Sequence, residues 1–136
     1  HRSSAPWGPI QMTASILVVD DSKSSRKLNL AMVHELLGDQ VTYLDAAGGE
    51  AAMAILTSQP VDLVLLDLTM PGMNGFDVLA AMREQHIHSR VIVVSADIQT
   101  KAKERVAALG ATGFIEKPIK IDALRAVLTQ LGALHR

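Results

Sequence analysis

Five short, mostly apolar runs alternate along the chain with five segments whose apolar residues recur at helical spacing. The runs, which have the length of strands, cover residues 16–20, 41–47, 61–67, 91–95 and 113–117. The helical segments cover residues 22–37, 50–57, 74–85, 101–109 and 121–131. Strict alternation of strands and helices indicates an α/β fold in which a parallel sheet is covered by helices on both faces.

Three of these segments carry further expectations about burial. The run 16–20 is apolar until its last residue, as expected for a strand that is buried on both faces. The run 41–47 is more polar, which places it nearer an edge of the sheet. In the first helical segment, Leu28, Met32 and Leu36 recur at helical spacing and predict its apolar face.

Length and composition favour one domain. The chain has 136 residues, 49% of them hydrophobic and 3% aromatic, which is enough to bury an aliphatic core. We expect this domain to cover residues 15–134 and residues 1–14 to form a disordered lead-in. An expression scar ahead of a start at Met12 is one origin for that lead-in.

Charge and cysteine content exclude several classes of function. The net charge of −1 gives no overall field for nucleic acid or anionic lipid. The absence of cysteine excludes disulfides and thiolate chemistry and fits a cytoplasmic protein. No apolar run is long enough to span a bilayer. We therefore expect neither a membrane partner nor direct nucleic-acid binding.

Acidic side chains stand at the ends of two expected strands. Asp20 ends the first strand, Asp21 follows it, and Asp67 ends the third. Parallel strands end along one edge of the sheet, where ligands of open α/β sheets bind. If these two strands are neighbours, the crowded carboxylates need a cation, and their oxygen ligands suit Mg²⁺. Taken alone, the acidic pair could instead cap a helix.

A hydroxyl and an ammonium group are expected on the opposite side of the same edge. Ser95 ends the fourth strand and Lys117 the fifth. Both side chains suit phosphate oxygens, and an aspartate can act as a nucleophile toward phosphorus. The pattern therefore predicts that Asp67 carries a phosphoryl group beside Mg²⁺, Lys117 and Ser95.

Four pieces of the sequence together resemble the receiver domain of response regulators in two-component signalling. They are VVDD at 18–21, LLDLTMPGMNG at 65–75, VVSAD at 93–97 and GFIEKP at 113–118. Each piece alone is a weak signal, whereas all four in this order are specific. The resemblance implies a flavodoxin-like, doubly wound sheet of five parallel strands in the order 2-1-3-4-5, with five helices.

The resemblance also implies the chemistry of the site. Asp67 would be the phosphoacceptor, Lys117 would pair with the phosphoryl group, and Ser95 would close on it with its hydroxyl. The bond between Lys117 and Pro118 would be cis, which costs little only before proline.

The same resemblance implies a metal site and a switching residue. Asp21, Asp67 and the backbone carbonyl of Thr69 would bind Mg²⁺ directly, and Asp20 would act through a water. Phe114 stands where the family has a switching aromatic residue, and it lacks the phenolic oxygen of tyrosine. No other cofactor is implied.

The function implied by the resemblance is a signalling switch and not an enzyme, apart from assistance with its own phosphotransfer and dephosphorylation. A sensor histidine kinase or a phosphotransfer protein would supply the phosphoryl group. A downstream protein would then bind the face formed by 101–109, 113–117 and 121–131. We expect a monomeric, stand-alone receiver, as in chemotaxis or a phosphorelay. The alternative is a receiver fragment of a longer regulator with a DNA-binding or enzymatic output.

Three other interpretations of these residues are weaker. Haloacid-dehalogenase-like phosphatases also end an apolar strand on a nucleophilic Asp, but they need a second acid two residues later, where this chain has Thr69. A flavin-binding module needs a Ser/Thr/Gly-rich loop after the first strand, where this chain has Asp20 and Asp21. His86 and His88 form an H-x-H pattern that could bind metal, but their polar loop predicts solvated side chains.

Overall fold

The described part of this computed structural model, residues 14–97 and 99–134, contains five strands and five helices in strict alternation. The strands are β1 (Ser15–Val19), β2 (Thr42–Ala46), β3 (Leu63–Asp67), β4 (Arg90–Ser95) and β5 (Gly113–Glu116). The helices are α1 (Lys23–Leu37), α2 (Gly49–Ser58), α3 (Gly75–Glu84), α4 (Thr100–Ala108) and α5 (Ile121–Gln130). All bounds agree with the predicted ranges to within two residues. The predicted lead-in lies outside the described residues, except for Ala14.

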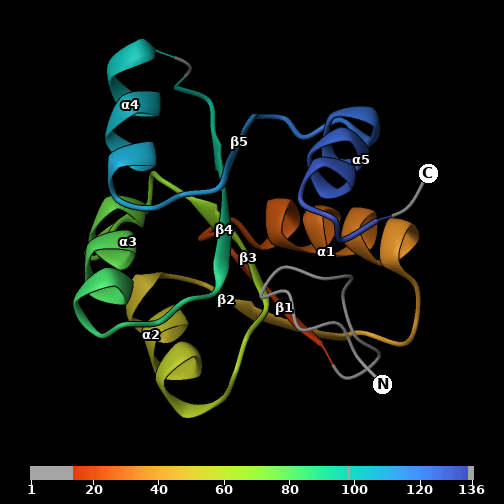
Figure 1. The fold of residues 1–136 in the computed structure, drawn as a ribbon, viewed down its shortest axis with the longest axis horizontal. Helices are drawn as coiled ribbons and strands as arrows, with labels where there is room; N and C mark the ends of the chain where they lie inside the picture. The colour runs from red at the N-terminus through yellow and green to blue at the C-terminus, as the bar shows by residue number, and fades with distance from the viewer. Residues whose placement is uncertain (1–13, 98, 135–136) are drawn as a thin grey trace.

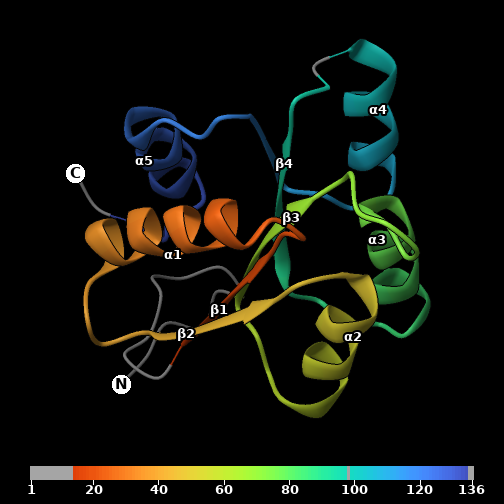
Figure 2. The ribbon, with the colours of Figure 1, turned by 180° about the vertical axis from the view of Figure 1, so that it is seen from behind.

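The five strands form one parallel sheet in the order β2-β1-β3-β4-β5, which confirms the predicted α/β, flavodoxin-like fold. Helices α1 and α5 cover one face, and α2, α3 and α4 cover the other (Figures 1 and 2). Strands β1 and β3 are neighbours, with Val19 paired to Leu66. The residues that follow these two positions therefore emerge side by side at one edge of the sheet.

Alternate residues of the central strands supply two separate cores. Leu17 and Val64 are fully buried on the face covered by α2, α3 and α4, whereas Ile16 and Leu65 are buried on the face of α1 and α5. Strand β3 is buried along its whole length, as the run of apolar residues predicts for a strand covered on both faces. Strand β2 is partly exposed at the edge, which confirms its predicted position.

Helix α1 packs on the sheet with part of its predicted apolar face, since Met32 and Leu36 lie partly buried against the core but Leu28 does not. Leu28 is 51% exposed, whereas Asn29 and Val33 are the buried residues of the helix. A shift of one residue turns a helix by about 100°. At the start of the helix, the Ser25 hydroxyl donates a hydrogen bond of 2.6 Å to the Asp20 carboxylate.

No helix among the described residues combines the length and the apolarity that crossing a bilayer requires.

Candidate functional site

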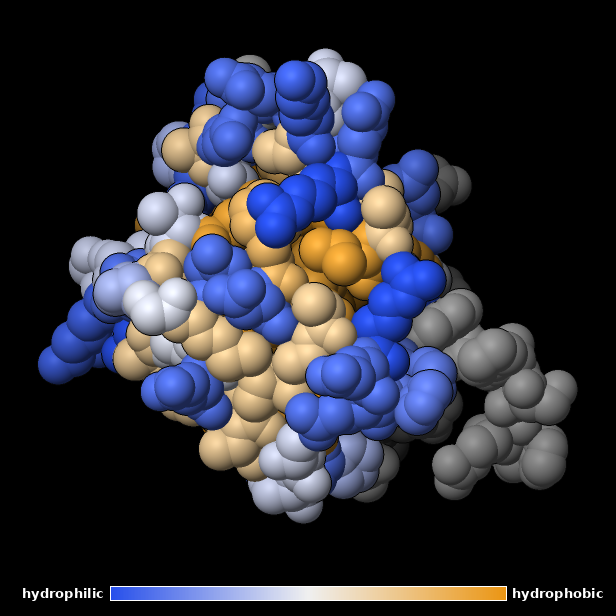
Figure 3. All heavy atoms as spheres, turned by 90° about the vertical axis from the view of Figure 1, so that its left-hand side faces the viewer, coloured by the Kyte–Doolittle hydropathy of each residue, from blue (hydrophilic) through white to orange (hydrophobic). Residues whose placement is uncertain are grey.

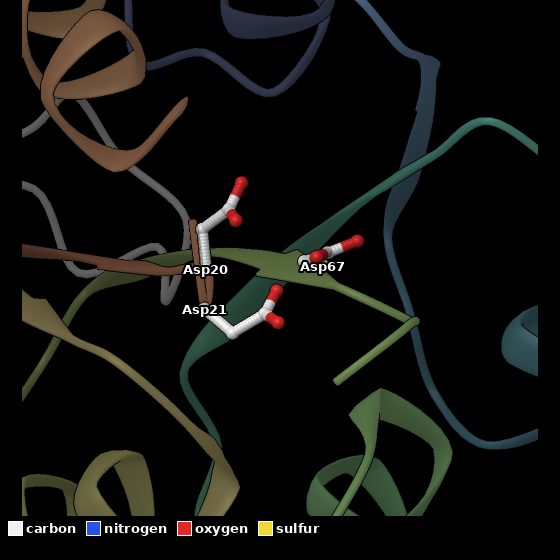
Figure 4. A group of neighbouring side chains, drawn as sticks. All are labelled: Asp20, Asp21 and Asp67. Carbon is white, nitrogen blue, oxygen red and sulfur yellow. The ribbon is translucent and has the colours of Figure 1, made fainter. Parts of the chain in front are cut away.

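Three carboxylates meet at the ends of β1 and β3, as the sequence predicts. Asp20 and Asp21 follow the last residue of β1, and Asp67 is the last residue of β3. One oxygen from each of the three lies within 4.8 Å of the others. Figure 4 shows the three side chains next to one another at the strand ends. Asp20 and Asp67 are buried, whereas Asp21 is exposed and leaves the cluster open to solvent.

Asp20 is the most completely bonded member of the cluster. Its carboxylate accepts hydrogen bonds from the Ser22 amide at 2.9 Å and the Ser25 hydroxyl at 2.6 Å. Lys117 Nζ donates to it at 3.0 Å. Burial alone would raise the pKa of Asp20, but the bonds from Ser25, Ser22 and Lys117 outweigh burial and lower the pKa. Asp20 is therefore a fixed negative charge beneath the site.

Asp67 has fewer stabilising contacts. Lys117 Nζ lies 3.4 Å from one carboxylate oxygen, and the Thr69 amide lies 3.4 Å from the other. Burial raises the pKa of Asp67, the attraction of Lys117 lowers it, and the nearby charge of Asp20 raises it again. The net pKa is raised. The negative charge of the Asp67 carboxylate is therefore only partly compensated by its neighbours.

Lys117 connects both acids from the end of β5. Burial would lower its pKa, but the hydrogen bond to Asp20 and the charge of Asp67 outweigh burial and raise it. The ammonium group therefore stays charged between the two carboxylates. Its peptide bond to Pro118 is cis, which confirms the expectation from the resemblance.

Ser95 and Phe114 belong to β4 and β5, the two strands that lie on the other side of β3 from β1. Ser95 is the last residue of β4 and is 1% exposed, and its hydroxyl accepts a hydrogen bond of 3.0 Å from the Asp97 amide. Phe114 is half-buried in β5, and its ring centroid lies 5.5 Å from Nζ of Lys103 in α4. Thr69, the remaining predicted site residue, is exposed.

Two residues of α1 that sequence reasoning missed support the acidic loop. Ser25 bonds the Asp20 carboxylate directly. Arg26 donates to the backbone carbonyl of Asp20 at 2.8 Å and pairs with the Asp45 carboxylate at 2.7 Å. The available signal was their spacing, since positions five and six after Asp20 fall in the first turn of the helix and face back toward the strand end.

Gly75 is a third missed position. A Cβ atom there would lie 2.5 Å from the carbonyl oxygen of Asp67 and 2.7 Å from the Cα atom of Leu68. Only glycine allows α3 to begin this close to the backbone of the expected phosphoacceptor. The sequence signal was Gly75 itself, the last residue of the piece 65–75, to which sequence analysis assigned no role beyond membership of the helical segment 74–85.

The histidines lie away from this cluster. His86 and His88 are exposed in the segment between α3 and β4, as predicted. His34 lies on the surface of α1, where it pairs with Asp39. Among residues 14–97 and 99–134, the three aspartates are the one group of three or more possible metal-binding side chains of this type.

Comparisons with known proteins agree with this geometry. The family described as "Response regulator receiver domain" matches residues 16–129. The probable chemotaxis protein CheY of Rhizobium etli is 34% identical over 122 residues, which cover 88% of this chain and 93% of that protein. The crystallized chemotaxis protein CheY4 of Vibrio cholerae is 27% identical with a TM-score of 0.78, over 88% of this chain and 98% of that one.

A further relative is longer than this chain. The probable C4-dicarboxylate response regulator DctR of Halalkalibacterium halodurans is 31% identical over 121 residues, which cover 89% of this chain and 52% of that protein. The chain therefore spans about half the length of this relative, and the similarity is confined to one part of it. From the family match and the shared fold, the chain belongs to the response regulator receiver domain family.

Proposed function

We propose that the domain of residues 15–134 is a phosphorylation-dependent switch whose phosphoacceptor is Asp67. The observation that carries this proposal is the meeting of three carboxylates at the strand ends, with an oxygen of each within 4.8 Å of the others, where the buried Asp67 lies 3.4 Å from Lys117 Nζ. A nearby cation stabilises the charged form of a buried carboxylate, and an aspartate carboxylate can act as a nucleophile toward phosphorus. Receiver domains are signalling domains of two-component systems, and phosphorylation as a switch is general to the family.

The donor set at the strand ends fits Mg²⁺. Asp21 and Asp67 would bind it directly with the backbone carbonyl of Thr69, and Asp20 would act through a water. Carboxylate oxygens within 4.8 Å of one another suit a hard cation that keeps open positions. When bound, the ion supplies positive charge to the oxygens of the phosphoryl group.

The residues of the chain divide the transfer among them. A carboxylate oxygen of Asp67 forms the bond to phosphorus, while the bond from phosphorus to the donor histidine nitrogen breaks and its electron pair stays on that nitrogen. Lys117 neutralises charge on the phosphoryl oxygens. The Ser95 hydroxyl, which here accepts a hydrogen bond from the Asp97 amide, would donate a hydrogen bond to one of these oxygens. Asp20 keeps Lys117 in place through its 3.0 Å hydrogen bond.

The family indicates the kind of partner. Receiver domains act in two-component systems, so the phosphodonor would be a sensor histidine kinase or a phosphotransfer protein. The downstream partner would bind the face of α4, β5 and α5.

The test is phosphorylation by a small phosphodonor. We expect the intact mass of the wild-type chain to rise by one phosphoryl group after incubation with acetyl phosphate and Mg²⁺. Asp67→Asn removes the nucleophile and should show no increase. The matched control is Asp122→Asn, because Asp122 is an exposed aspartate of α5; this variant should behave as the wild type. A phosphoryl group on Asp67→Asn, or on none of the three proteins, would contradict the assignment.

A further inference from the structure

A second cavity lies at the opposite end of the sheet from Asp67. It measures about 460 Å³ and is bounded by the end of α3, by the segment 85–89 and by the end of α4. Asp67 stands where β3 ends, whereas this cavity lies where β4 begins, so the two sites share no residue. Small-molecule sites usually measure about 300–1,000 Å³, and this cavity falls within that range.

The interior of this cavity is apolar. Leu79, Met82 and Val91 line it and are buried members of the hydrophobic core. Ile87 and Leu109 are half-buried and form parts of its walls. Figure 3 looks onto this side of the molecule, where strongly hydrophobic side chains lie in a hollow between hydrophilic ones. An aliphatic or aromatic group of a ligand would therefore find matching surface inside.

The rim of the cavity carries donors. Arg83, His86 and His88 line it and are exposed. Ser89 and Thr112 also line it, but their hydroxyls already donate to the backbone carbonyls of residues 61 and 91 at 2.5 and 3.0 Å. No Asp or Glu lines this cavity in the described part of the chain. The rim is therefore complementary to an anion and not to a cation.

Arg83 is held in place at the cavity by the protein itself. One guanidinium nitrogen donates to the carbonyl of Ala108, the last residue of α4, at 2.6 Å. A guanidinium carries five N–H donors, so donors remain for a ligand. The bond fixes the planar group between α3 and α4, and a fixed guanidinium loses little freedom when it binds a carboxylate.

We propose that this cavity binds an amphipathic monocarboxylate, such as a medium-chain fatty-acid anion. The apolar chain would pack against Leu79, Met82 and Val91, and the carboxylate would pair with Arg83 at the rim. A small inorganic anion would leave the apolar interior unfilled, and a neutral apolar compound would leave the donors of the rim without a partner. This site is separate from the proposed phosphorylation at Asp67.

Octanoate is the probe for the test, with 1-octanol as the uncharged molecule of the same chain length. We expect saturable amide shifts in two-dimensional NMR spectra when octanoate is added below its micelle concentration. The shifts should be confined to residues 79–91 and 108–112. Asp67→Asn should bind octanoate as the wild type does, so failure of the phosphorylation proposal would leave this result unchanged.

Two arginine variants decide the role of the rim. Arg83→Gln should weaken octanoate binding roughly tenfold or more, as loss of a charge-assisted hydrogen bond predicts, and should leave 1-octanol binding unchanged. Arg125→Gln, in the exposed surface of α5, is the matched control and should bind both probes normally.

Three results would overturn the proposal. The first is no saturable octanoate binding at millimolar concentrations. The second is binding of 1-octanol as tight as that of octanoate, since the cavity would then not recognise a carboxylate. The third is concentration-dependent self-association of the chain that Leu109→Asp abolishes, which would assign the cavity to a second copy of the molecule.

Discussion

Two neighbouring aspartates of this site are in opposite electrostatic situations. Asp20 has a lowered pKa because three donors outweigh the effect of burial, whereas Asp67 has a raised pKa because burial prevails. The sequence predicted that both would lie at one edge of the sheet. It could not distinguish them, because the difference depends on hydrogen bonds from the Ser22 amide and the Ser25 hydroxyl, which the pattern of residues does not reveal. The fixed charge of Asp20 suits a support, and the under-compensated charge of Asp67 suits a nucleophile.

The contribution of Ser25 can be measured directly. Ser25→Ala removes the 2.6 Å hydrogen bond to the buried Asp20 carboxylate. Hydrogen bonds to charged groups contribute about 1.5–3 kcal/mol, so we expect a loss of that order in the free energy of unfolding. Urea denaturation followed by circular dichroism measures this change. Ser24→Ala is the control, because Ser24 is exposed and its hydroxyl contacts only that of Ser22, at 3.3 Å; equal losses in the two variants would contradict the assigned role.

The raised pKa of Asp67 predicts a pH-dependent effect on stability. Without metal, the folded state binds the Asp67 proton more tightly than the unfolded state, so stability is lost as pH rises through the folded pKa. Asp67→Asn cannot ionise and should be more stable than the wild type at neutral pH. The difference should shrink as pH falls through the folded pKa and should be gone below the ordinary pKa of 3.8, where the carboxyl group is protonated in both states.

Thermal unfolding of both proteins from pH 3 to pH 8 in a chelating buffer tests this prediction. Mg²⁺ should narrow the gap at neutral pH, because it stabilises the folded wild type by binding to it. A variant that is less stable than the wild type at neutral pH, without metal, would show that the contact with Lys117 outweighs burial.

At the scale of secondary-structure elements, the strands were more predictable than the faces of the helices. Strands β1, β3 and β4 are short apolar runs buried on both faces. The order of apolar residues along the chain is therefore enough to locate them, without knowing which elements pack against them. The predicted apolar face of α1 was right at Met32 and Leu36 but wrong at Leu28, which faces solvent. At the start of the same helix, the Ser25 hydroxyl bonds the Asp20 carboxylate. Such a contact between side chains of different elements leaves no periodic signal in the sequence.

The beginning of α3 offers a test of local structure next to the site. Asn74 and Asp77 form a capping box, in which each side chain accepts a 3.0 Å hydrogen bond from the other's backbone amide. Asn74→Ala should cost about 1 kcal/mol in the free energy of unfolding. Gln99, which precedes α4, makes no such side-chain bond, so Gln99→Ala is the matched control and should cost much less. Guanidinium denaturation compares the two; an equal cost would argue against a stabilising capping box.

At the scale of the whole molecule, the strand order brings residues far apart in sequence to one edge. Lys117 follows β5, which lies beyond β3 and β4 in the sheet. Its ammonium group nevertheless reaches the carboxylate of Asp20, which stands 97 positions earlier in the chain. The sequence predicted this convergence, since all parallel strands end at the same edge. It could not predict that Lys103 of α4 lies 5.5 Å from the centroid of the Phe114 ring. That contact depends on how α4 packs. It places the ammonium group of Lys103, on the proposed partner face, next to the ring of the predicted switching residue Phe114.

We expect the response of the whole molecule to phosphorylation to depend on Ser95. Its buried hydroxyl stands at the end of β4, next to β5, where residue 116 is its register partner. If the hydroxyl moves to the phosphoryl group, it leaves its bond with the Asp97 amide, and the segment that leads into α4 must follow. Ser95→Ala should therefore still accept a phosphoryl group on Asp67, because the nucleophile and Lys117 remain. The linked changes at Phe114 and α4 should be several-fold smaller, as loss of roughly 1–3 kcal/mol of coupling predicts.

Amide NMR spectra before and after treatment with acetyl phosphate and Mg²⁺ measure both steps, because shifts near Asp67 report phosphorylation and shifts in α4 and β5 report the response. Ser58→Ala is the control, since Ser58 is exposed in α2 and its hydroxyl donates only to a backbone carbonyl of its own helix, at 3.0 Å. Full changes in α4 for phosphorylated Ser95→Ala would show that the signal travels by another route. A variant that fails to take up phosphate would instead assign Ser95 to the transfer itself, because its hydroxyl would then be needed before any switch occurs.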